Sequence, residues 1–283
     1  MRIISLNAWG GQLWDTLADW LPGCGADILL LQEVTRMHAP LPETATDGWL
    51  EYRDAWRTLR QRADLLSDVA TLLPGWQGVF APAARGPLSA ADARTVCSEH
   101  GIAAFFAPRL ALCAQASGFV HGAFRPDGWG PEPVPRPIQA FRVFDPMSGA
   151  RRVVAHLHGL RDPAGKGDSP ARAAQAERIA SFLEAFAGRD EEIVLAGDFN
   201  LLPDSASFAR LARLGLHDLV TAHGHTDTRT SHYGKPVRYA DYMLVTESVA
   251  VDAFDVPALP EVSDHRPLVL DIASARTHAS GIA

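Results

Sequence analysis

Residues 193–200 read Ile-Val-Leu-Ala-Gly-Asp-Phe-Asn. A compact apolar run of this kind is typical of a strand buried inside a sheet. The run ends in Asp198 and Asn200, so two polar side chains stand where the strand leaves the core. Taken alone, these two residues could form an Asx-turn that caps a helix near Ser205. The stretch therefore predicts a buried strand whose end carries either a turn or a functional site.

The same arrangement, a polar residue at the end of an apolar run, recurs along the chain. The further examples are Asn7 after residues 3–6, Glu33 after 28–31, His158 after 153–157, and Asp264 and His265 before 267–270. Carboxylates that gather at one edge of a sheet repel one another unless a divalent cation lies among them. Oxygen ligands suit Mg²⁺ or Mn²⁺ better than zinc. The pattern therefore predicts a metal site of this kind.

The remaining sequence predicts a layered α+β or α/β domain. Apolar patterning predicts strands at 2–6, 26–31, 78–82, 102–107, 138–144, 151–157, 193–196, 239–245, 249–254 and 268–272. Helical periodicity and capping residues predict helices at 13–21, about 49–73, 169–188 and 205–214. Segments 83–100 and 124–137 are rich in proline, glycine or alanine and predict loops.

Composition narrows the class of protein. With 283 residues, 47% of them hydrophobic and 21% charged, the chain can bury a large core, which disfavours a disordered, collagen-like or coiled-coil protein. We expect one domain over residues 1–275 and a C-terminal tail at 276–283. The net charge of −7 gives no basic footprint for nucleic acid, although a local patch stays possible.

Cysteine usage and hydropathy bear on location. Cys24, Cys97 and Cys113 form no CxxC pair and leave an odd count, which favours a reduced compartment over a disulfide framework. No uncharged run reaches the ~18 residues of a membrane span. We expect a cytoplasmic protein with no membrane partner, and the sequence leaves the oligomeric state open.

Six short motifs, taken together, resemble the endonuclease/exonuclease/phosphatase superfamily. They are Ser5-Leu6-Asn7, Leu31-Gln32-Glu33-Val34, His156-Leu157-His158-Gly159, Gly197-Asp198-Phe199-Asn200, Ala240-Asp241-Tyr242 and Ser263-Asp264-His265-Arg266-Pro267-Leu268. The resemblance implies the deoxyribonuclease I-like fold, an α+β four-layer α/β-sandwich with two mixed β-sheets packed face to face and flanked by helices. It also implies a metal-dependent phosphoesterase site at one end.

The resemblance further implies a metal-binding group. Glu33 would be the main ligand of Mg²⁺ or Mn²⁺, helped by Asn7 and, directly or through water, by Asp264. Simpler interpretations exist, because Asn7 could cap a turn and Glu33 could be a solvated strand end.

Catalytic roles follow from the same resemblance. Asp198 would orient and deprotonate the attacking water, and Asn200 would hold the phosphate and that water in line. His265 would bond a phosphoryl oxygen, with Asp241 fixing its tautomer, while His158 would contact the phosphate from the other side.

Two residues of these motifs have other interpretations. Asp241 could also form an ordinary ion pair with Arg238 or Arg266. His156 is expected to be a buried or supporting histidine.

Candidates for contacting the substrate are Arg172, Arg229 and Tyr233, because arginine forks match phosphate geometry. Lys166 and Lys235 are equally well interpreted as solvated surface charge. Trp9, Trp129 or Tyr233 could stack on a base or sugar, although packing in the core or in a loop is the simpler interpretation for most of them.

The sequence therefore predicts a divalent-metal-dependent phosphoesterase that hydrolyses a phosphodiester bond by in-line attack of water. Alternatives are a phosphomonoesterase acting on a sugar or inositol phosphate, a non-catalytic binding module on the same fold, and a metal-dependent lyase. The expected partner is a phosphoester substrate, and nucleic acid is possible but not supported by the net charge.

Overall fold

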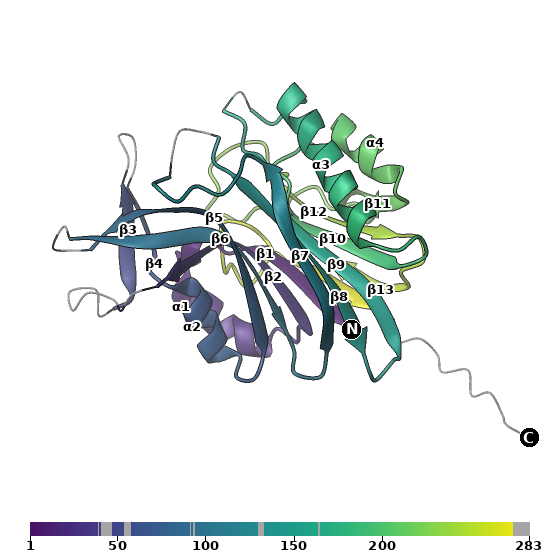
Figure 1. The fold of residues 1–283 in the computed structure, drawn as a ribbon, viewed down its shortest axis with the longest axis horizontal. Helices are drawn as coiled ribbons and strands as arrows, with labels where there is room; N and C mark the ends of the chain where they lie inside the picture. Colours follow the sequence, from purple (N-terminus) through teal and green to yellow (C-terminus); the bar gives the residue numbers. More distant parts are fainter. Residues whose placement is uncertain are drawn as a thin grey trace, which may run out of the picture.

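The structure is a computed structural model that describes residues 1–38, 40, 47–53, 58–90, 92, 94–129, 133–163 and 165–273. Its strands form two mixed sheets (Figure 1). The larger sheet has the order β13-β14-β1-β2-β6-β5-β3-β4, and the smaller one has the order β11-β12-β10-β9-β8-β7.

The strand bounds complete this description. The larger sheet contains β1 (Arg2–Asn7), β2 (Ile28–Met37), β3 (Trp49–Arg53), β4 (Thr58–Arg62), β5 (Gln77–Ser89), β6 (Thr95–Phe106), β13 (Val251–Asp255) and β14 (Leu268–Ile272). The smaller sheet contains β7 (Ala111–His121), β8 (Arg136–Asp145), β9 (Ala150–His158), β10 (Glu192–Asp198), β11 (Leu216–Asp218) and β12 (Asp241–Thr246).

Helices cover the outer faces of the two sheets. They are α1 (Trp14–Trp20), α2 (Leu65–Leu72), α3 (Pro170–Phe186), α4 (Ala206–Ala212) and α5 (Leu219–Ala222), with short 3₁₀ turns at Trp9–Gly11 and Leu21–Gly23. In Figure 1, α1 and α2 lie on the side of the larger sheet, and α3 and α4 on the side of the smaller one. The predicted four-layer sandwich is confirmed.

Alternation along β1 explains how the layers are held together. Ile3 shares a buried cluster with Phe141 and Leu195 of the smaller sheet, so it faces the space between the sheets. Ile4, the next residue, packs with Leu17 of α1 on the opposite face. Because both faces of these central strands are buried, their sequences are continuous apolar runs.

Strand direction brings the polar strand ends to one edge of the sandwich. β1 runs parallel to β2, with Asn7 opposite Gln32, and β9 runs parallel to β10, with His158 opposite Asp198. β12 is antiparallel to β10, which places its first residue, Asp241, opposite Asp198. Parallel neighbours end at the same edge, so the pattern of polar strand ends becomes a cluster in space.

Two segments differ from the sequence-based expectation. The helix expected over about 49–73 is wrong: residues 49–53 and 58–62 form the hairpin strands β3 and β4, and only Leu65–Leu72 is helical. The loop expected at 83–100 is also wrong, because most of it belongs to β5 and β6, paired from Gln77 and Phe106 out to Ser89 and Thr95. In these segments backbone pairing prevails over a sequence rich in arginine, proline and glycine.

We call β3, β4 and the distal parts of β5 (83–89) and β6 (95–100) the arm, which projects to the left in Figure 1. The arm has a small core of its own, formed by Leu50, Ala63, Leu88 and Ala90, against which Tyr52 and Trp129 pack. The β7–β8 connection reaches this region. Of the loop expected at 124–137, the described residues 124–129 and 133–135 lie outside the named strands and helices, 130–132 lie outside the described residues, and Arg136 and Pro137 belong to β8.

The tail expected at residues 276–283 lies outside the described residues. Within the described part of the chain, none of the helices combines the length and apolar character needed to cross a bilayer.

Candidate active site

Asn7 links the two sheets at the strand-end edge. It is fully buried, and its Nδ2 donates to Glu33 Oε1 at 3.1 Å and to Asp198 Oδ2 at 3.1 Å. Its Oδ1 accepts a hydrogen bond from the backbone of Trp9 at 3.0 Å. Asn7 therefore acts as a donor that holds two carboxylates together, and its side chain would have to turn over to offer an oxygen to a metal.

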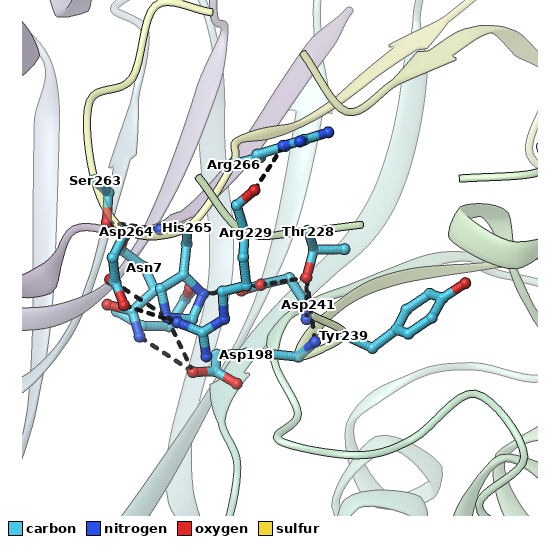
Figure 2. Close-up of polar contacts among 12 residues, drawn as sticks. Asn7, Asp198, Thr228, Arg229, Tyr239, Asp241, Ser263, Asp264, His265 and Arg266 are labelled. Carbon is cyan, nitrogen blue, oxygen red and sulfur yellow. Dashed lines mark hydrogen bonds and ion pairs between the residues drawn. The ribbon is translucent and has the colours of Figure 1, made fainter. Parts of the chain in front are cut away.

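His265 and Asp241 form a hydrogen-bonded pair beside Asp198 (Figure 2). His265 Nδ1 lies 2.8 Å from Asp241 Oδ2, and Thr228 Oγ1 donates to the same oxygen at 2.9 Å. His265 Nε2 faces the cluster, 3.8 Å from Asp198 Oδ2. The expected pairing of Asp241 with His265 is thus present in the geometry, and it turns Nε2 toward the cluster.

Arg229 lies beside this pair. The segment 228–230 pairs with 264–266 through backbone hydrogen bonds from Thr230 to Asp264 and from Arg266 to Thr228. Arg229 Nη1 donates to Asp264 Oδ2 at 2.9 Å and contacts His265 Nε2. Although Arg229 is buried, it borders the cavity that Asp198 and His265 line, so this expected substrate residue lies within the cluster.

Tyr233 and Arg172, the other expected substrate residues, differ in setting. Tyr233 lines the cavity, with its ring 4.2 Å from the Arg229 guanidinium carbon. Arg172 donates to the backbone oxygens of Asn200 at 2.5 Å and Gly165 at 2.7 Å. The Arg172 side chain therefore holds the loops that form the cavity wall, even though it also borders the cavity.

His158 is the second histidine close to Asp198. Its Nε2 is 3.7 Å from Asp198 Oδ2 and 3.9 Å from Glu33 Oε1. Arg136, the first residue of β8, places Nη1 about 3 Å from both ring nitrogens, at 3.0 and 2.9 Å. Sequence reasoning missed Arg136. Its position at the start of a strand that pairs with the His158 strand was the available signal.

Asn200 occupies a tight turn after β10. Its backbone nitrogen donates to Asp198 Oδ1 at 2.9 Å, so the Asx-turn weighed as an alternative exists alongside the cluster. Its Nδ2 points toward Gly159 O at 3.5 Å. A Cβ at Gly159 would lie 2.4 Å from the Phe199 oxygen, so glycine is required where the two strand ends meet.

The contacts of Asp241 and His156 decide between their alternative interpretations. Arg238 and Arg266 both pair with Asp227 at 2.8 Å, which leaves Asp241 to His265 and Thr228. His156 is fully buried and contacts Gln139 Oε1 at 2.9 Å through Nε2, as expected of a supporting residue.

Among the residues that the structure describes, three non-glycine residues have positive φ, and all three belong to this edge: Trp9 (51°), Glu33 (56°) and Asn200 (54°). This left-handed region is costly for residues with a side chain. At Glu33 the ladder between β2 and β6 shifts register, which marks a bulge. Local strain concentrated around ligand-facing residues is typical of functional sites.

Burial and neighbouring charges set the protonation of the cluster. Burial raises the pKa of Asp198, and Asp241 adds to this effect, while His265 and Arg229 oppose it. Burial also acts to raise the pKa of Glu33, but His100 and the Asn7 hydrogen bond outweigh it and hold that pKa below its ordinary value.

The two histidines differ in charge. Burial lowers the pKa of His265, yet Asp241 outweighs this effect and the net pKa is raised. Burial, reinforced by Arg136, holds the pKa of His158 well below its ordinary value. His265 is therefore the histidine suited to carry a proton, whereas His158 is neutral.

The donor set fits a hard divalent cation. Asp264 Oδ1 is buried and has no hydrogen-bond partner among the described residues, and burial raises the pKa of Asp264. An added cation would relieve the crowding of Glu33, Asp198 and Asp264. Asp198, Asp241 and His265 also offer ligand atoms within 4.8 Å of one another. Asp241 is already hydrogen-bonded to His265 Nδ1 and Thr228 Oγ1, so the carboxylates toward Glu33 are the better ligands.

These residues line one cavity of about 780 Å³. Of the expected site residues, Glu33, His158, Arg172, Asp198, Asn200, Arg229, Tyr233, Asp264 and His265 border it. Asn7 and Asp241 lie behind them, in contact with Asp198 and His265 respectively. Lys166 also borders the cavity and donates to Tyr239 O. The lining residues that sequence reasoning missed include His100, Arg136 and Tyr52.

Comparisons with known proteins agree with this geometry. The model of the endonuclease/exonuclease/phosphatase family matches residues 4–265. No curated protein sequence matches the chain significantly.

Solved structures resemble the whole chain. A mannosyl-6-phosphatase from Bacteroides thetaiotaomicron is 16% identical with a TM-score of 0.67, and the match covers 96% of this chain and 99% of that one. The human Nocturnin catalytic domain is 19% identical with a TM-score of 0.63, covering 96% and 93%. A Beutenbergia cavernae protein titled endonuclease/exonuclease/phosphatase is 20% identical with a TM-score of 0.68, covering 97% and 71%.

At these identities the solved structures establish a shared fold, and the family model covers nearly all of the described chain. The chain belongs to the endonuclease/exonuclease/phosphatase family, whose members act on phosphoester bonds.

Proposed function

We propose that this protein is a divalent-metal-dependent phosphodiesterase that hydrolyses its substrate by in-line attack of water. The observation that carries the proposal is the convergence of Glu33, Asp198, His158 and His265 on one cavity, with Asp198 at the centre of their contacts. Phosphoryl transfer depends on positioning and on neutralising charge around phosphorus, which is what such a ring of groups supplies.

Asp198 is the group proposed to receive the proton of the attacking water. Asn7 holds Asp198 Oδ2, and the Asn200 backbone holds Oδ1, so the carboxylate has a fixed orientation. The water oxygen forms a bond to phosphorus, its proton passes to Asp198, and the phosphorus–oxygen bond to the leaving group breaks. A buried carboxylate whose pKa is raised by burial is a stronger base than one in water.

His265, Arg229 and His158 are proposed to bind phosphoryl oxygens. His265, paired through Nδ1 with Asp241, and Arg229, which contacts Nε2 of that ring, are proposed to present positive charge to one side of the phosphoryl group. His158, held neutral, donates a single hydrogen bond from the other side. The two sides therefore differ in charge, which favours a phosphoryl group held in one orientation.

Glu33 and Asp264 are the residues proposed to hold Mg²⁺ or Mn²⁺, with Asn7 in support. When bound there, the cation supplies Lewis acidity that neutralises charge on the phosphoryl group. The oxygen-rich donor set supports this assignment, as does Asp264 Oδ1, which has no hydrogen-bond partner among the described residues.

Hydrolysis of a phosphomonoester is the second candidate. One of the solved structures with this fold is named a mannosyl-6-phosphatase, an enzyme named for a monoester. Arg136, Lys166 and Arg229 border the cavity and could balance the second negative charge of a monoester. The net charge of −7 favours a small phosphoester over nucleic acid in either case.

The test is hydrolysis of bis-p-nitrophenyl phosphate beside p-nitrophenyl phosphate, each with Mg²⁺, Mn²⁺ or EDTA, and with Asp198→Asn as the blank. Metal-dependent cleavage of the diester supports the proposal, and preference for the monoester selects the second candidate. Failure to cleave either, with metal bound, would favour the binding-module alternative.

A further inference from the structure

The cavity has two unlike ends. The strand-end cluster supplies carboxylates, histidines and arginines at one end. The described residues that β3, β4 and the β7–β8 connection contribute to the lining are all uncharged: Tyr52, Leu59, Gln61, Trp129 and Val134. We call Tyr52, Leu59 and Trp129 the aromatic wall. A phosphoryl group would pair with the charged residues of the strand-end cluster. The aromatic wall would then contact the organic part of the substrate.

Trp129 is held in a fixed position. Its indole Nε1 donates to Pro87 O at 2.9 Å, and Arg125 Nη1 donates to its backbone oxygen at 3.1 Å. The segment before it is tied to β5 by backbone hydrogen bonds from Arg85 to Arg125 O at 2.7 Å and from Gly128 to Arg85 O at 2.8 Å. The indole therefore does not have to be ordered when a ligand binds, which favours affinity.

The backbone of β5 is adapted to the indole. Gly86 is buried, and a Cβ added there would lie 2.6 Å from the Trp129 ring, closer than any side chain allows. Trp129 can lie against the strand because residue 86 has no side chain. This close approach is a specific feature of the arm and not a general consequence of apolar packing.

Tyr52 lies next to Trp129 in the aromatic wall. Its ring meets the Trp129 ring at a centroid distance of 6.0 Å and an interplanar angle of 69°, an edge-to-face contact. Both rings pack against the small core of the arm, while also bordering the cavity. Two rigid rings at a steep angle offer a face and an edge to a planar group.

We propose that the aromatic wall binds a planar aromatic group in the organic part of the phosphoester, so that the protein selects aryl or nucleoside esters over small alkyl or hydroxylated ones. This inference rests on the proposed function, since it assigns the substrate class of the same site. Stacking on aromatic side chains strengthens the binding of a base and tolerates different base sequences, because every base has a π-face. The wall carries few polar groups with which to satisfy the hydroxyls of a sugar.

The test measures binding without turnover, by calorimetry on the full-length protein in the presence of Mn²⁺. Methylphosphonate, cyclohexylphosphonate, phenylphosphonate and the longer 4-biphenylylphosphonate share one charged group and differ in the organic part. The 5′-methylenephosphonate of thymidine represents a nucleoside ester. We expect the better aromatic ligand to bind at least 10-fold more tightly than the methyl compound, and more tightly than the cyclohexyl compound.

Variants assign the preference to the wall. We expect Trp129→Ala and Tyr52→Ala each to reduce the ratio of aromatic-phosphonate affinity to methylphosphonate affinity about 10-fold. Trp129→Phe should retain most of this ratio. Trp49→Ala is the matched control, because Trp49 is an aromatic residue of the same strand as Tyr52. The guanidinium carbon of Arg60 lies 4.3 Å from the centre of the Trp49 ring, and Trp49 does not line the cavity. Unchanged methylphosphonate binding shows that a variant is folded.

Several outcomes would overturn the inference. Equal binding of the methyl and aromatic compounds, tighter binding of the cyclohexyl compound or of a hexose 6-phosphate, or an unchanged ratio in Trp129→Ala would each do so. Hydrolysis without aromatic preference overturns this inference alone. Aromatic preference without hydrolysis by the metal-loaded protein overturns the proposed catalysis alone, and absence of any phosphonate binding overturns both.

Discussion

The strand-end cluster and the arm are built in opposite ways. The cluster lies where buried parallel strands end, and Asn7, His158 and Asp198 follow directly from continuous apolar runs. The arm consists of strands in which β3 has one buried residue and β4 has none, with a core of only a few small or aliphatic side chains. Burial of side chains determines the structure of the strand-end cluster, whereas backbone hydrogen bonding between strands determines the structure of the arm.

This difference fits the different roles that we propose for the two regions. Groups that perform the chemistry need the rigid sheet edge, because small displacements of reacting groups are costly. Groups that select the organic part of a substrate need only a stable surface. If the arm selects the organic part as proposed, its sequence can vary without disturbing the reaction, and substitutions in the two regions should differ in the size and kind of their effects.

The largest effect is expected for Asp198→Asn, which removes the proposed base. We expect kcat to fall about 10³-fold, within the range for loss of a positioned general base, with the fold unchanged. Single-turnover hydrolysis of bis-p-nitrophenyl phosphate measures this effect. Asp204→Asn, an exposed carboxyl on the loop that follows β10, is the control. A variant that loses Mn²⁺ affinity but keeps its single-turnover rate would show that Asp198 is a metal ligand instead.

The next effect is expected for Glu33→Gln, which removes a proposed metal ligand. We expect Mn²⁺ affinity to fall roughly 30-fold or more, since even supporting residues of metal sites contribute 10–100-fold. Calorimetric titration with Mn²⁺ measures the change. Glu51→Gln, on the arm and paired with Arg53, should leave the affinity unchanged. Wild-type affinity and activity in Glu33→Gln would contradict the ligand assignment.

A smaller and more selective effect is expected for Gly86→Ala on the arm. The added Cβ would displace the Trp129 ring, so the preference for aromatic over methyl phosphonates should fall about 10-fold, while methylphosphonate affinity stays constant. Gly78→Ala lies on the same strand and crowds Phe105, away from the wall, so it should leave the preference intact. Equal loss in both variants would assign the effect to the strand as a whole.

The smallest effect is expected far from both regions, at Glu191. Its carboxylate accepts hydrogen bonds from Arg142 Nε and Nη2, both at 2.7 Å, and this contact lowers its pKa to about 2. Because the folded-state pKa is depressed, the stabilisation is complete above the ordinary carboxyl pKa and declines as pH falls toward 2.

Urea unfolding of Glu191→Gln measures this contribution. We expect a loss of about 1 kcal/mol at pH 7 that shrinks between pH 5 and pH 3, with activity unchanged. Glu184→Gln, whose exposed carboxylate lies 3.5 Å from Arg210, should change little at any pH. A loss that is independent of pH would exclude the ion pair as its cause.

The sequence predicts the sandwich and the cluster well, for a physical reason. Strands such as β1, β2, β9 and β10 are apolar on both faces, and the polar residues that end them stand out against that background. The residues expected at the cluster all lie in or directly behind one cavity, although their individual roles stay predictions.

The arm could not be predicted in this way. Leu59, Leu65, Leu66 and Val69 suggest helical spacing across a region that contains a strand and a short helix. β7 was also missed, because its small and polar residues alternate between exposed and half-buried positions without a continuous apolar run. The close approach of Trp129 to Gly86 joins residues far apart in sequence, and nothing local indicates it.

The positive φ angles of Glu33 and Asn200 have a consequence for evolution and engineering. Glycine is the residue best suited to such backbone angles, so selection for stability alone would favour replacing both side chains, and with them the proposed chemistry. These positions would therefore report a trade-off: variants recovered by thermal selection should lose activity first at the strand ends, whereas variants in the arm should change specificity. At Glu33 and Asn200, a side chain with a proposed function is thus retained at a backbone angle where glycine would be more stable.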